Sequence, residues 1–304
     1  MDKTFPQASQ GLSVSVPSNR ASWGDFIELT KPGINLSNLI AVFTGYWLAT
    51  SGNIQGWTLG FTLLGAALVI AGGCICNNVI DRDIDPLMFR TSERAVACGR
   101  ISVALALTIA IGMTITGLIV LWKCAHPLAA LLALLGFVVY VGIYSAWLKR
   151  THWSNTIIGG MAGAVPPMIG YAADAGKLDG VAWGLCLLLL LWQPPHFYAL
   201  SMRRVKEYRQ AGIPMLPVIK GFLSTKRQIL LFVILLWLAS LMMAWSTALG
   251  SFYLGGALVL GGIYLFLASK GFFTQETSKW ARVMFRYSLY YLLGIFITII
   301  IDVL

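Results

Sequence analysis

Residues 77–94 read NNVIDRDIDPLMFRTSER and follow directly on an apolar run of the chain. Within this stretch Asn77, Asp81 and Asp85 are spaced four residues apart, so on a helix each lies about 40° round from the one before it, and all three share one stripe. Pro86 disfavours helical geometry at the residue before it, which predicts that the helix ends at Asp85. Three oxygen-bearing side chains are therefore expected to point inward from the last turns of a helix.

This stripe is typical of a magnesium site. Unpaired carbonyls and the negative end of the helix dipole lie at a helix C-terminus and attract a cation there. A few hard oxygen ligands in an open arrangement suit Mg2+, which takes its remaining ligands from water and phosphate oxygens. We therefore predict metal binding by Asn77, Asp81 and Asp85. The arginines of the same stretch could hold the phosphates, and these are Arg82, Arg90 and Arg94.

The composition is that of a polytopic membrane protein. Hydrophobic residues make up 58% of the 304 residues, charged residues only 11%, and the mean hydropathy is +0.76. The net charge of +10 does not indicate a nucleic-acid partner, because the basic residues lie in loops between apolar runs. An aspartate at membrane depth is costly and usually functional, which favours the metal site over a solvated loop in which arginines and aspartates neutralise one another.

The predicted fold is all-α. A window of about twenty residues finds nine apolar runs long enough to cross a bilayer. These candidate spans are 34–51, 57–76, 103–122, 128–147, 155–173, 181–200, 228–249, 251–269 and 283–303. Twenty of the 22 Lys and Arg residues then fall on one side, and only Lys123 and Lys177 on the other. By the positive-inside rule, the N-terminus and residues 77–94 face the cytoplasm.

The first 22 residues are polar, rich in Ser, Pro and Gln, and lack the apolar segment of a cleaved signal peptide. We predict a disordered cytoplasmic tail over residues 1–22 and a single transmembrane domain over residues 23–304. The protein is expected in a bacterial cytoplasmic membrane, in contact with the lipid bilayer.

A second group of candidate residues lies in LWQPPHFYALSMRRVKEYRQAGIPMLPVIKG, residues 191–221. His196 has two interpretations: an imidazole that faces a buried pocket, as a haem ligand or proton shuttle, or an interior histidine that donates to a neighbouring carbonyl. Glu207 is the only acid in this basic loop. It belongs either to a site or to an ion pair with Arg203, four residues earlier on the same helix face.

The pattern of Asn77, Asp81 and Asp85 within GCICNNVIDRDID resembles the N-x-x-x-D-x-x-x-D motif of the UbiA superfamily of intramembrane prenyltransferases. Further segments are similar to the branch of that superfamily that farnesylates protohaem IX. They are LTKPGINLSNLI at 29–40, RTSERAVACGRIS at 90–102, VVYVGIYSAWLKR at 138–150, GAVPPMIGY at 163–171, LWQPPHFYAL at 191–200 and EYRQAGIPMLPVIKG at 207–221.

The resemblance implies nine transmembrane helices around a central cavity, with two acidic motifs facing each other at its cytoplasmic mouth. Asn77, Asp81 and Asp85 would bind Mg2+ and the diphosphate, Glu207 would stand in the second acidic motif, and His196 would face the haem. The two aspartates and Glu207 are the implied catalytic residues. Four basic residues become implied partners of the diphosphate or of haem propionates, although two of them end the fourth span, where snorkelling anchors are usual; they are Arg90, Arg94, Lys149 and Arg150.

The implied reaction transfers the farnesyl group of farnesyl diphosphate to a vinyl group of protohaem IX, or haem B, with addition of water. The products are haem O and diphosphate. Contact with a haem A synthase or an oxidase assembly factor is a further expectation. Two alternatives stay open: a related prenyltransferase with another acceptor, such as an aromatic acid, and a transporter whose intramembrane carboxylates bind an ion. The concentration of carboxylates and arginines at one mouth argues against the transporter.

Overall fold

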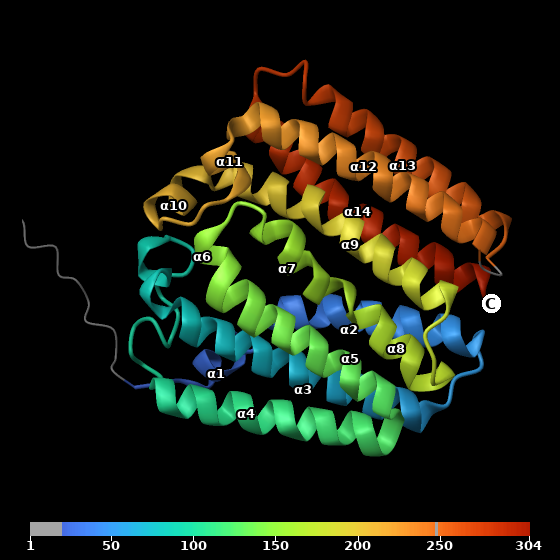
Figure 1. Ribbon diagram of the computed structural model, residues 1–304, viewed down its shortest axis with the longest axis horizontal. Helices are drawn as coiled ribbons and strands as arrows, with labels where there is room; N and C mark the ends of the chain where they lie inside the picture. Colours follow the sequence, from blue (N-terminus) through green and yellow to red (C-terminus); the bar gives the residue numbers. More distant parts are fainter. Residues whose placement is uncertain (1–19, 247–248) are drawn as a thin grey trace, which may run out of the picture.

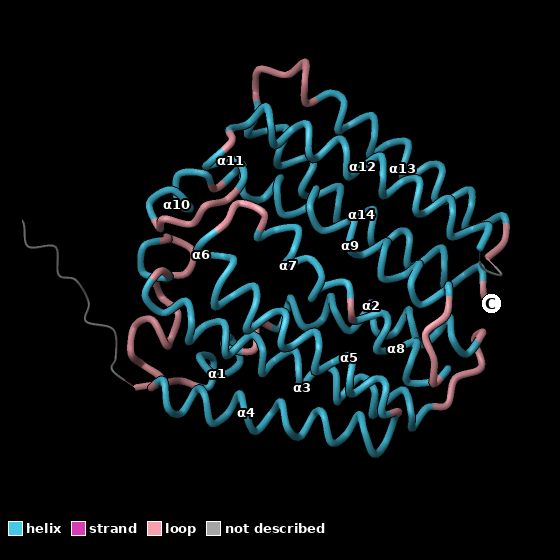
Figure 2. The backbone as a smooth tube through the Cα atoms, in the orientation of Figure 1, coloured by secondary structure: helices cyan, strands magenta, loops and turns pink. Residues whose placement is uncertain are grey.

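The computed structural model describes residues 20–246 and 249–304, which form a bundle of helices that run side by side (Figures 1 and 2). These residues contain no strand. In chain order the elements are α1 (Trp23–Leu29), α2 (Pro32–Thr50), α3 (Gly56–Ile80), η1 (Asp81–Asp83), η2 (Asp85–Leu87), α4 (Val103–Val120), η3 (Leu121–Ala125), α5 (Pro127–Val138), η4 (Val139–Leu148), α6 (Lys149–Thr151), α7 (Asn155–Ala164), α8 (Pro166–Ala175), α9 (Gly180–Arg203), α10 (Val205–Gln210), α11 (Leu216–Ile219), α12 (Gly221–Ser246), α13 (Ser251–Lys270) and α14 (Thr277–Asp302). The predicted all-α class is confirmed. Most of the predicted tail, residues 1–19, lies outside the described residues.

Eight helices of the described part are long and apolar enough to cross a membrane, which makes this a multi-pass membrane protein. They cover Gly56–Asp83, Val103–Ala125, Pro127–Thr151, Asn155–Ala175, Gly180–Arg203, Gly221–Trp245, Ser251–Lys270 and Thr277–Asp302. The first predicted span, 34–51, coincides with α2, which packs against α8 but is not one of these eight. Nine crossings and a central cavity therefore stay predictions.

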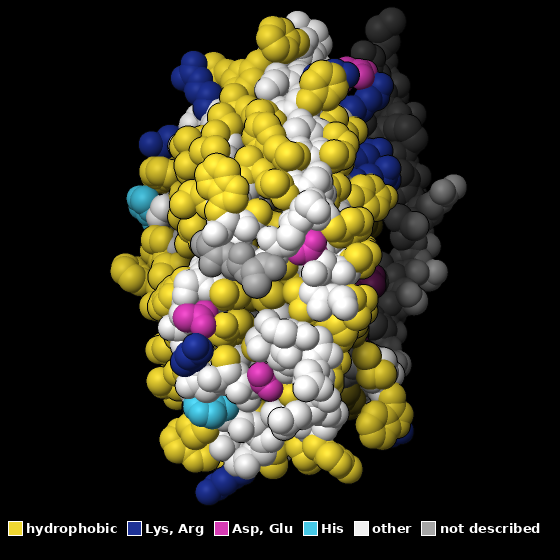
Figure 3. Space-filling view, turned by 90° about the vertical axis from the view of Figure 1, so that its right-hand side faces the viewer, with side chains coloured by type: hydrophobic (Ala, Val, Ile, Leu, Met, Phe, Trp, Pro, Cys, Tyr) yellow, Lys and Arg dark blue, Asp and Glu magenta, His cyan; other side chains and the backbone are white. Residues whose placement is uncertain are grey.

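The charged connections gather at one end of the bundle. Figure 1 places α1, α6 and α10 together at its left-hand end and the C-terminus at the opposite end. We call the left-hand end, with residues 20–31, 81–102, 149–154 and 203–220, the charged end. Figure 3 looks onto the opposite end, where hydrophobic and uncharged side chains dominate and Lys and Arg lie mainly at the edges of the view. This distribution agrees with the prediction that the basic loops lie on one side of the membrane.

The α-helix of the opening stretch ends earlier than predicted. It stops at Ile80, and the chain continues in two tighter 3-10 turns, η1 and η2, so the prediction of a helix as far as Asp85 is wrong. Arginine side chains take two of the end carbonyls: Arg82 Nη1 donates to Val79 O at 2.9 Å, and Arg150 Nη2 donates to Ile80 O at 2.6 Å. Because arginine side chains donate to these carbonyls, the helix can end at Ile80, five residues before Asp85, where Pro86 predicted its end.

Two glycines let α2 and α8 touch backbone to backbone. A Cβ on Gly170 would lie 1.8 Å from the carbonyl oxygen of Val42, and a Cβ on Gly45 would lie 1.9 Å from that of Pro167. Backbone atoms cannot move aside as a flexible side chain can. This contact holds α2 against the first half of the bundle. It thereby also positions residues 20–31, which precede α2 at the charged end.

We predict that Gly170→Ala lowers the free energy of unfolding by about 3 kcal/mol, because the added methyl group overpacks a backbone contact. Denaturant unfolding of the purified protein in detergent measures the change. Gly112→Ala on α4 is the matched control, since nothing lies within 4 Å of the added carbon there. That control should stabilise the protein by up to about 1 kcal/mol through helix propensity. Equal effects of the two changes would contradict the close α2–α8 contact.

Candidate active site

The predicted metal-binding residues lie together in the protein interior at the charged end. Asn77 is 4% exposed, and Asp81 and Asp85 are each 1% exposed. Between them, Arg82 and Asp83 are exposed to solvent. The inward stripe read from the four-residue spacing therefore persists, although 3-10 turns replace the last turn of the predicted helix.

Each residue of this stripe accepts from a cation supplied by another segment. Lys31 Nζ donates to Asn77 Oδ1. Lys149 Nζ lies 2.5 Å from Asp81 Oδ2, and Arg94 Nη1 lies 2.9 and 2.8 Å from the two carboxylate oxygens of Asp85. Burial raises the pKa of Asp85, and the Arg94 guanidinium opposes that shift. The arrangement collects three positive charges around two buried carboxylates.

Lys31 is the residue that sequence reasoning missed, because it is 46 positions from Asn77 and was counted only as a basic residue before the first span. It adopts a left-handed conformation with φ of 50°, directly before Pro32. Such a conformation costs energy in a residue with a side chain and persists where the surroundings enforce it, often at functional sites. Burial also lowers the pKa of Lys31 to about 8. The sequence signals that could have found Lys31 were its place directly before Pro32 and its position within LTKPGINLSNLI, a segment that resembles the family.

Helix α5 continues into η4, a π-helical stretch whose wide turns are common near functional sites. Ser145 in η4 is buried and accepts from Asn77 Nδ2 at 3.0 Å. Tyr140 and Tyr144 stack with ring centroids 6.0 Å apart. Gly159 makes room for Tyr144, because a Cβ there would lie 2.4 Å from its ring. The stretch ends at Leu148, directly before Lys149, so it places both a hydroxyl and an ammonium group at the stripe.

Two of the predicted phosphate-binding arginines are engaged at the end of α3 and not with the buried aspartates. Arg150 donates to both carboxylate oxygens of Asp83, at 2.7 and 2.6 Å, in addition to Ile80 O. Arg82 donates to Val79 O. Both side chains therefore shape the turn that carries Asp81.

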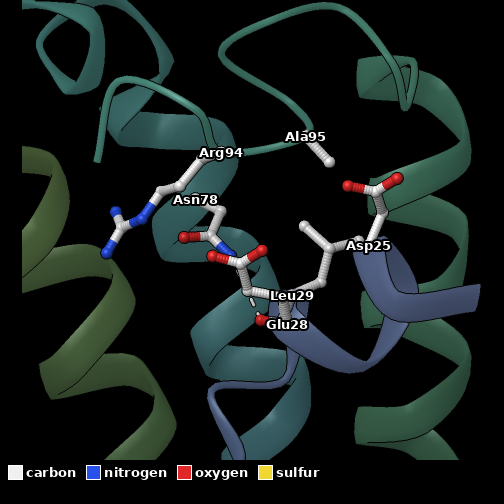
Figure 4. Close-up of a pocket in the computed structure, with 6 residues that line it drawn as sticks. All are labelled: Asp25, Glu28, Leu29, Asn78, Arg94 and Ala95. Atoms are coloured by element: carbon white, nitrogen blue, oxygen red, sulfur yellow. Dashed lines mark hydrogen bonds between the residues drawn. The ribbon is translucent and has the colours of Figure 1, made fainter. Parts of the chain in front are cut away.

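Arg90 and Arg94 line a surface pocket of about 340 Å³ together with Phe89, Glu93 and other residues of the same loop. A smaller adjoining pocket is drawn in Figure 4, where the Arg94 guanidinium points away from Asp25 and Glu28. Asp25 pairs with Arg100, which donates to it at 2.6 Å. This hydrogen bond lowers the pKa of Asp25 to about 2. Arg94 thus lies beside α1 but is directed to Asp85.

The second charged loop packs against the first. Ile84 and Met88 form one buried cluster with Ala211, Ile213 and Met215, and Tyr208 lies against it. The charges of Arg90, Arg94, Arg204 and Glu207 all act on Tyr208, which therefore stands between the two loops. Glu207 is half-buried, and its ion-pair partner is Arg204 at 3.5 Å and not Arg203, the partner considered as the alternative to a site.

His196 lies on α9 and contacts residues of α9 and α14, not those of the carboxylate stripe. Its Nδ1 is 2.7 Å from Ser288 Oγ, so its partner is a hydroxyl and not the carbonyl expected of an interior histidine. The ring is sandwiched between Trp192 and Phe285, with centroids 4.6 Å from each. The haem-facing role stays a prediction.

Asp81 gives the test of whether a divalent cation fits. Asp81 Oδ1 is buried and has no hydrogen-bond partner, so one anionic oxygen is left for a ligand. Among residues 20–246 and 249–304, no group of three or more His, Cys, Asp and Glu side chains lies together as a complete metal cage. Mg2+ is often held by one or two carboxylates plus phosphate oxygens, so the residues fit a metal that arrives with a diphosphate.

The site is thus a buried Asn–Asp–Asp stripe surrounded by cations, at one end of an apolar helical bundle. The UbiA prenyltransferase family model matches residues 38–290, and the chain belongs to that family. It is 48% identical over 285 residues to the protoheme IX farnesyltransferase of Alkalihalophilus pseudofirmus, covering 92% of this chain and 90% of the relative.

Solved structures share the fold. A digeranylgeranylglyceryl phosphate synthase superposes with a TM-score of 0.78 and 16% identity over 92% of this chain and 98% of that one. A UbiA homolog from Archaeoglobus fulgidus bound to GPP and Mg2+ gives a TM-score of 0.66 and 15% identity over 90% and 99% of the two chains. The prediction of a UbiA-type prenyltransferase is confirmed.

We predict that Arg150→Met lowers the free energy of unfolding by about 1–3 kcal/mol, because Ile80 O loses its donor at a buried helix end. Arg209→Met is the control, since the Arg209 side chain is exposed and a surface change of this kind costs about 0.5 kcal/mol or less. Denaturant titration in detergent compares the two. A stable Arg150→Met protein would show that Arg150 does not hold the end of α3.

Proposed function

We propose that this prenyltransferase transfers the farnesyl group of farnesyl diphosphate to a vinyl group of protohaem IX, with addition of water, giving haem O and diphosphate. The observation that carries the proposal is the buried set of Asn77, Asp81 and Asp85 with a cation on each. The protohaem acceptor rests on the relative that is 48% identical and is called a protoheme IX farnesyltransferase.

Asn77, Asp81 and Asp85 are the proposed ligands of Mg2+. Asp81 Oδ1 supports this assignment, because it is the buried carboxylate oxygen that lacks a protein donor. When bound, Mg2+ withdraws negative charge from the diphosphate and so favours departure of that group.

The cations of the site bind and stabilise the leaving group. The allylic C–O bond breaks, and its electron pair stays with the diphosphate. Lys31, Lys149 and Arg94 stabilise that charge, because preorganised cations in a poorly hydrated site act far more strongly than in water. Without substrate the same groups neutralise the stripe, so substrate binding exchanges one set of charge-assisted hydrogen bonds for another. Arg90, which lines the surface pocket, is a further proposed partner of the diphosphate.

The protein supplies no nucleophile in this scheme. The terminal vinyl carbon of protohaem forms the new bond to C1 of the farnesyl group. Water then adds to the other vinyl carbon and loses a proton, which leaves a hydroxyethylfarnesyl side chain. Apolar surroundings such as Tyr140 and Tyr144 keep water from the farnesyl cation until the first bond has formed.

The proposed location is a bacterial cytoplasmic membrane, with the charged end toward the cytoplasm. The split of 20 basic residues against two supports this orientation. We expect haem O to pass to a haem A synthase or an oxidase assembly factor in contact with this protein.

We predict that Asp81→Asn lowers kcat for haem O formation by about 10²–10³-fold, because it removes charge that holds the metal and the diphosphate. Purified protein with Mg2+, labelled farnesyl diphosphate and either protohaem or 4-hydroxybenzoate measures both the rate and the acceptor. Asp83→Asn is the matched control, since Asp83 is exposed and paired with Arg150. Normal haem O formation by folded Asp81→Asn protein would refute the metal assignment. Prenylation of 4-hydroxybenzoate but not protohaem would refute the acceptor.

We predict that Glu207→Gln raises the KM for farnesyl diphosphate about tenfold and leaves haem affinity unchanged, as expected for loss of one charged contact in the second loop. Steady-state kinetics and haem titration measure the two effects separately. Parallel loss of both would indicate misfolding and not a role for Glu207 in diphosphate use.

A further inference from the structure

Four arginines converge at the charged end, where α9 and α14 lie side by side (Figure 1). The positive charges of Arg204, Arg282 and Arg286 all act on Arg203. Among the described residues, Glu207 is the one carboxylate within ion-pair distance of this group, and it reaches Arg204 alone. Like charges held together at the edge of an apolar bundle repel one another unless they share an anion. The scheme for diphosphate departure does not use this cluster.

An aromatic surface leads from the cluster into the bundle. Arg203 Cζ lies 5.4 Å from the centroid of the Phe285 ring, and that centroid lies 4.6 Å from the centroid of His196. Phe197 meets the edge of His196 with centroids 5.1 Å apart and is itself 39% exposed. Arg203 follows His196 by seven residues, so the two are separated by roughly 10 Å along α9. That separation is comparable with the distance from the centre of a porphyrin to its carboxylates.

The hydrogen bonds of Ser288 fix the tautomer of His196. Ser288 Oγ donates its only proton to Phe285 O at 2.6 Å, so it must accept from His196 Nδ1. Nε2 then carries the lone pair of the neutral ring. His196 is 8% exposed. Trp192 Nε1 donates to Ser288 O at 2.7 Å, which holds Trp192 and Ser288 together beside His196.

We propose that Arg203, Arg282 and Arg286 bind the carboxylates of the porphyrin acceptor, whose ring lies against the exposed side chain of Phe197. The assignment rests on the proposed function, because it takes protohaem as the acceptor. Guanidinium groups suit carboxylates through paired hydrogen bonds, and an aromatic surface suits a flat macrocycle. In protohaem the vinyl groups lie on the side away from the two propionates. Holding the propionates at the charged end therefore directs the vinyl side toward the membrane interior.

This assignment separates the two anionic substrates. The diphosphate uses the cations on the Asn77, Asp81 and Asp85 stripe, and the acceptor carboxylates use the cluster on α9 and α14. Arginines at the ends of spans commonly contact lipid headgroups instead. A test must therefore distinguish a carboxylate of the acceptor from a lipid phosphate.

The test compares protohaem with protohaem dimethyl ester, in which both carboxylates are blocked. Binding is titrated by absorbance, with the full-length protein in nanodiscs of zwitterionic lipid so that anionic headgroups do not compete. The parent protein should bind protohaem at least about tenfold more tightly than the ester. Arg203→Gln and the double change Arg282→Gln, Arg286→Gln should each weaken protohaem binding and reduce that ratio toward one, without changing the affinity for farnesyl diphosphate with Mg2+.

Lys270→Gln is the matched control, because Lys270 also lies over a phenylalanine, Phe266, at the end of a span. It should leave the ratio unchanged. If the parent binds and farnesylates protohaem but binds the ester equally well, the carboxylate site is refuted and the proposed function stands. If the parent does not bind protohaem at all, both fail. If the arginine changes leave the ratio unaltered but lower thermal stability only in anionic nanodiscs, the cluster binds lipid and the proposal is overturned.

Discussion

Two aspartates buried in an apolar bundle are the constraint on which the rest of this structure depends. Asp81 and Asp85 are each 1% exposed. An unpaired charge in such surroundings is strongly unfavourable, and removal of one partner from a buried pair typically costs about 3–5 kcal/mol. Lys31, Lys149 and Arg94 therefore have to reach the same place, and the first two come from segments far from α3 in the sequence.

The local backbone departs from regular α-helix wherever it serves the carboxylates. α3 tightens into 3-10 turns at Asp81, η4 widens into π-helix beside Asn77, and Lys31 takes a left-handed conformation before α2. Each departure sets the direction of a side chain that regular geometry would point elsewhere. Departures of the same kinds also occur away from the stripe, because Ser51 has φ of 50° and η3 is π-helical.

In the proposed chemistry the two halves of the bundle bind different substrates. Helices up to α8 supply the carboxylate stripe and its cations, and α9 with α14 supplies an aromatic surface and an arginine cluster. The two halves meet at the charged end through the cluster that joins Ile84 and Met88 to residues 211–215. A diphosphate on one side and a carboxylate-bearing acceptor on the other would approach each other across that junction.

The sequence by itself determined the class of fold, the end of the bundle that carries charge, and the inward stripe of Asn77, Asp81 and Asp85. Hydropathy and four-residue spacing are local properties, so they can be read directly from the chain. Only the tertiary structure decided which cation meets which carboxylate. Lys31 joins Asn77 across 46 positions and Lys149 joins Asp81 across 68, and no periodicity encodes such contacts. The end of α3 was likewise decided from outside, because the donor to its last carbonyl comes from Arg150 on a distant helix.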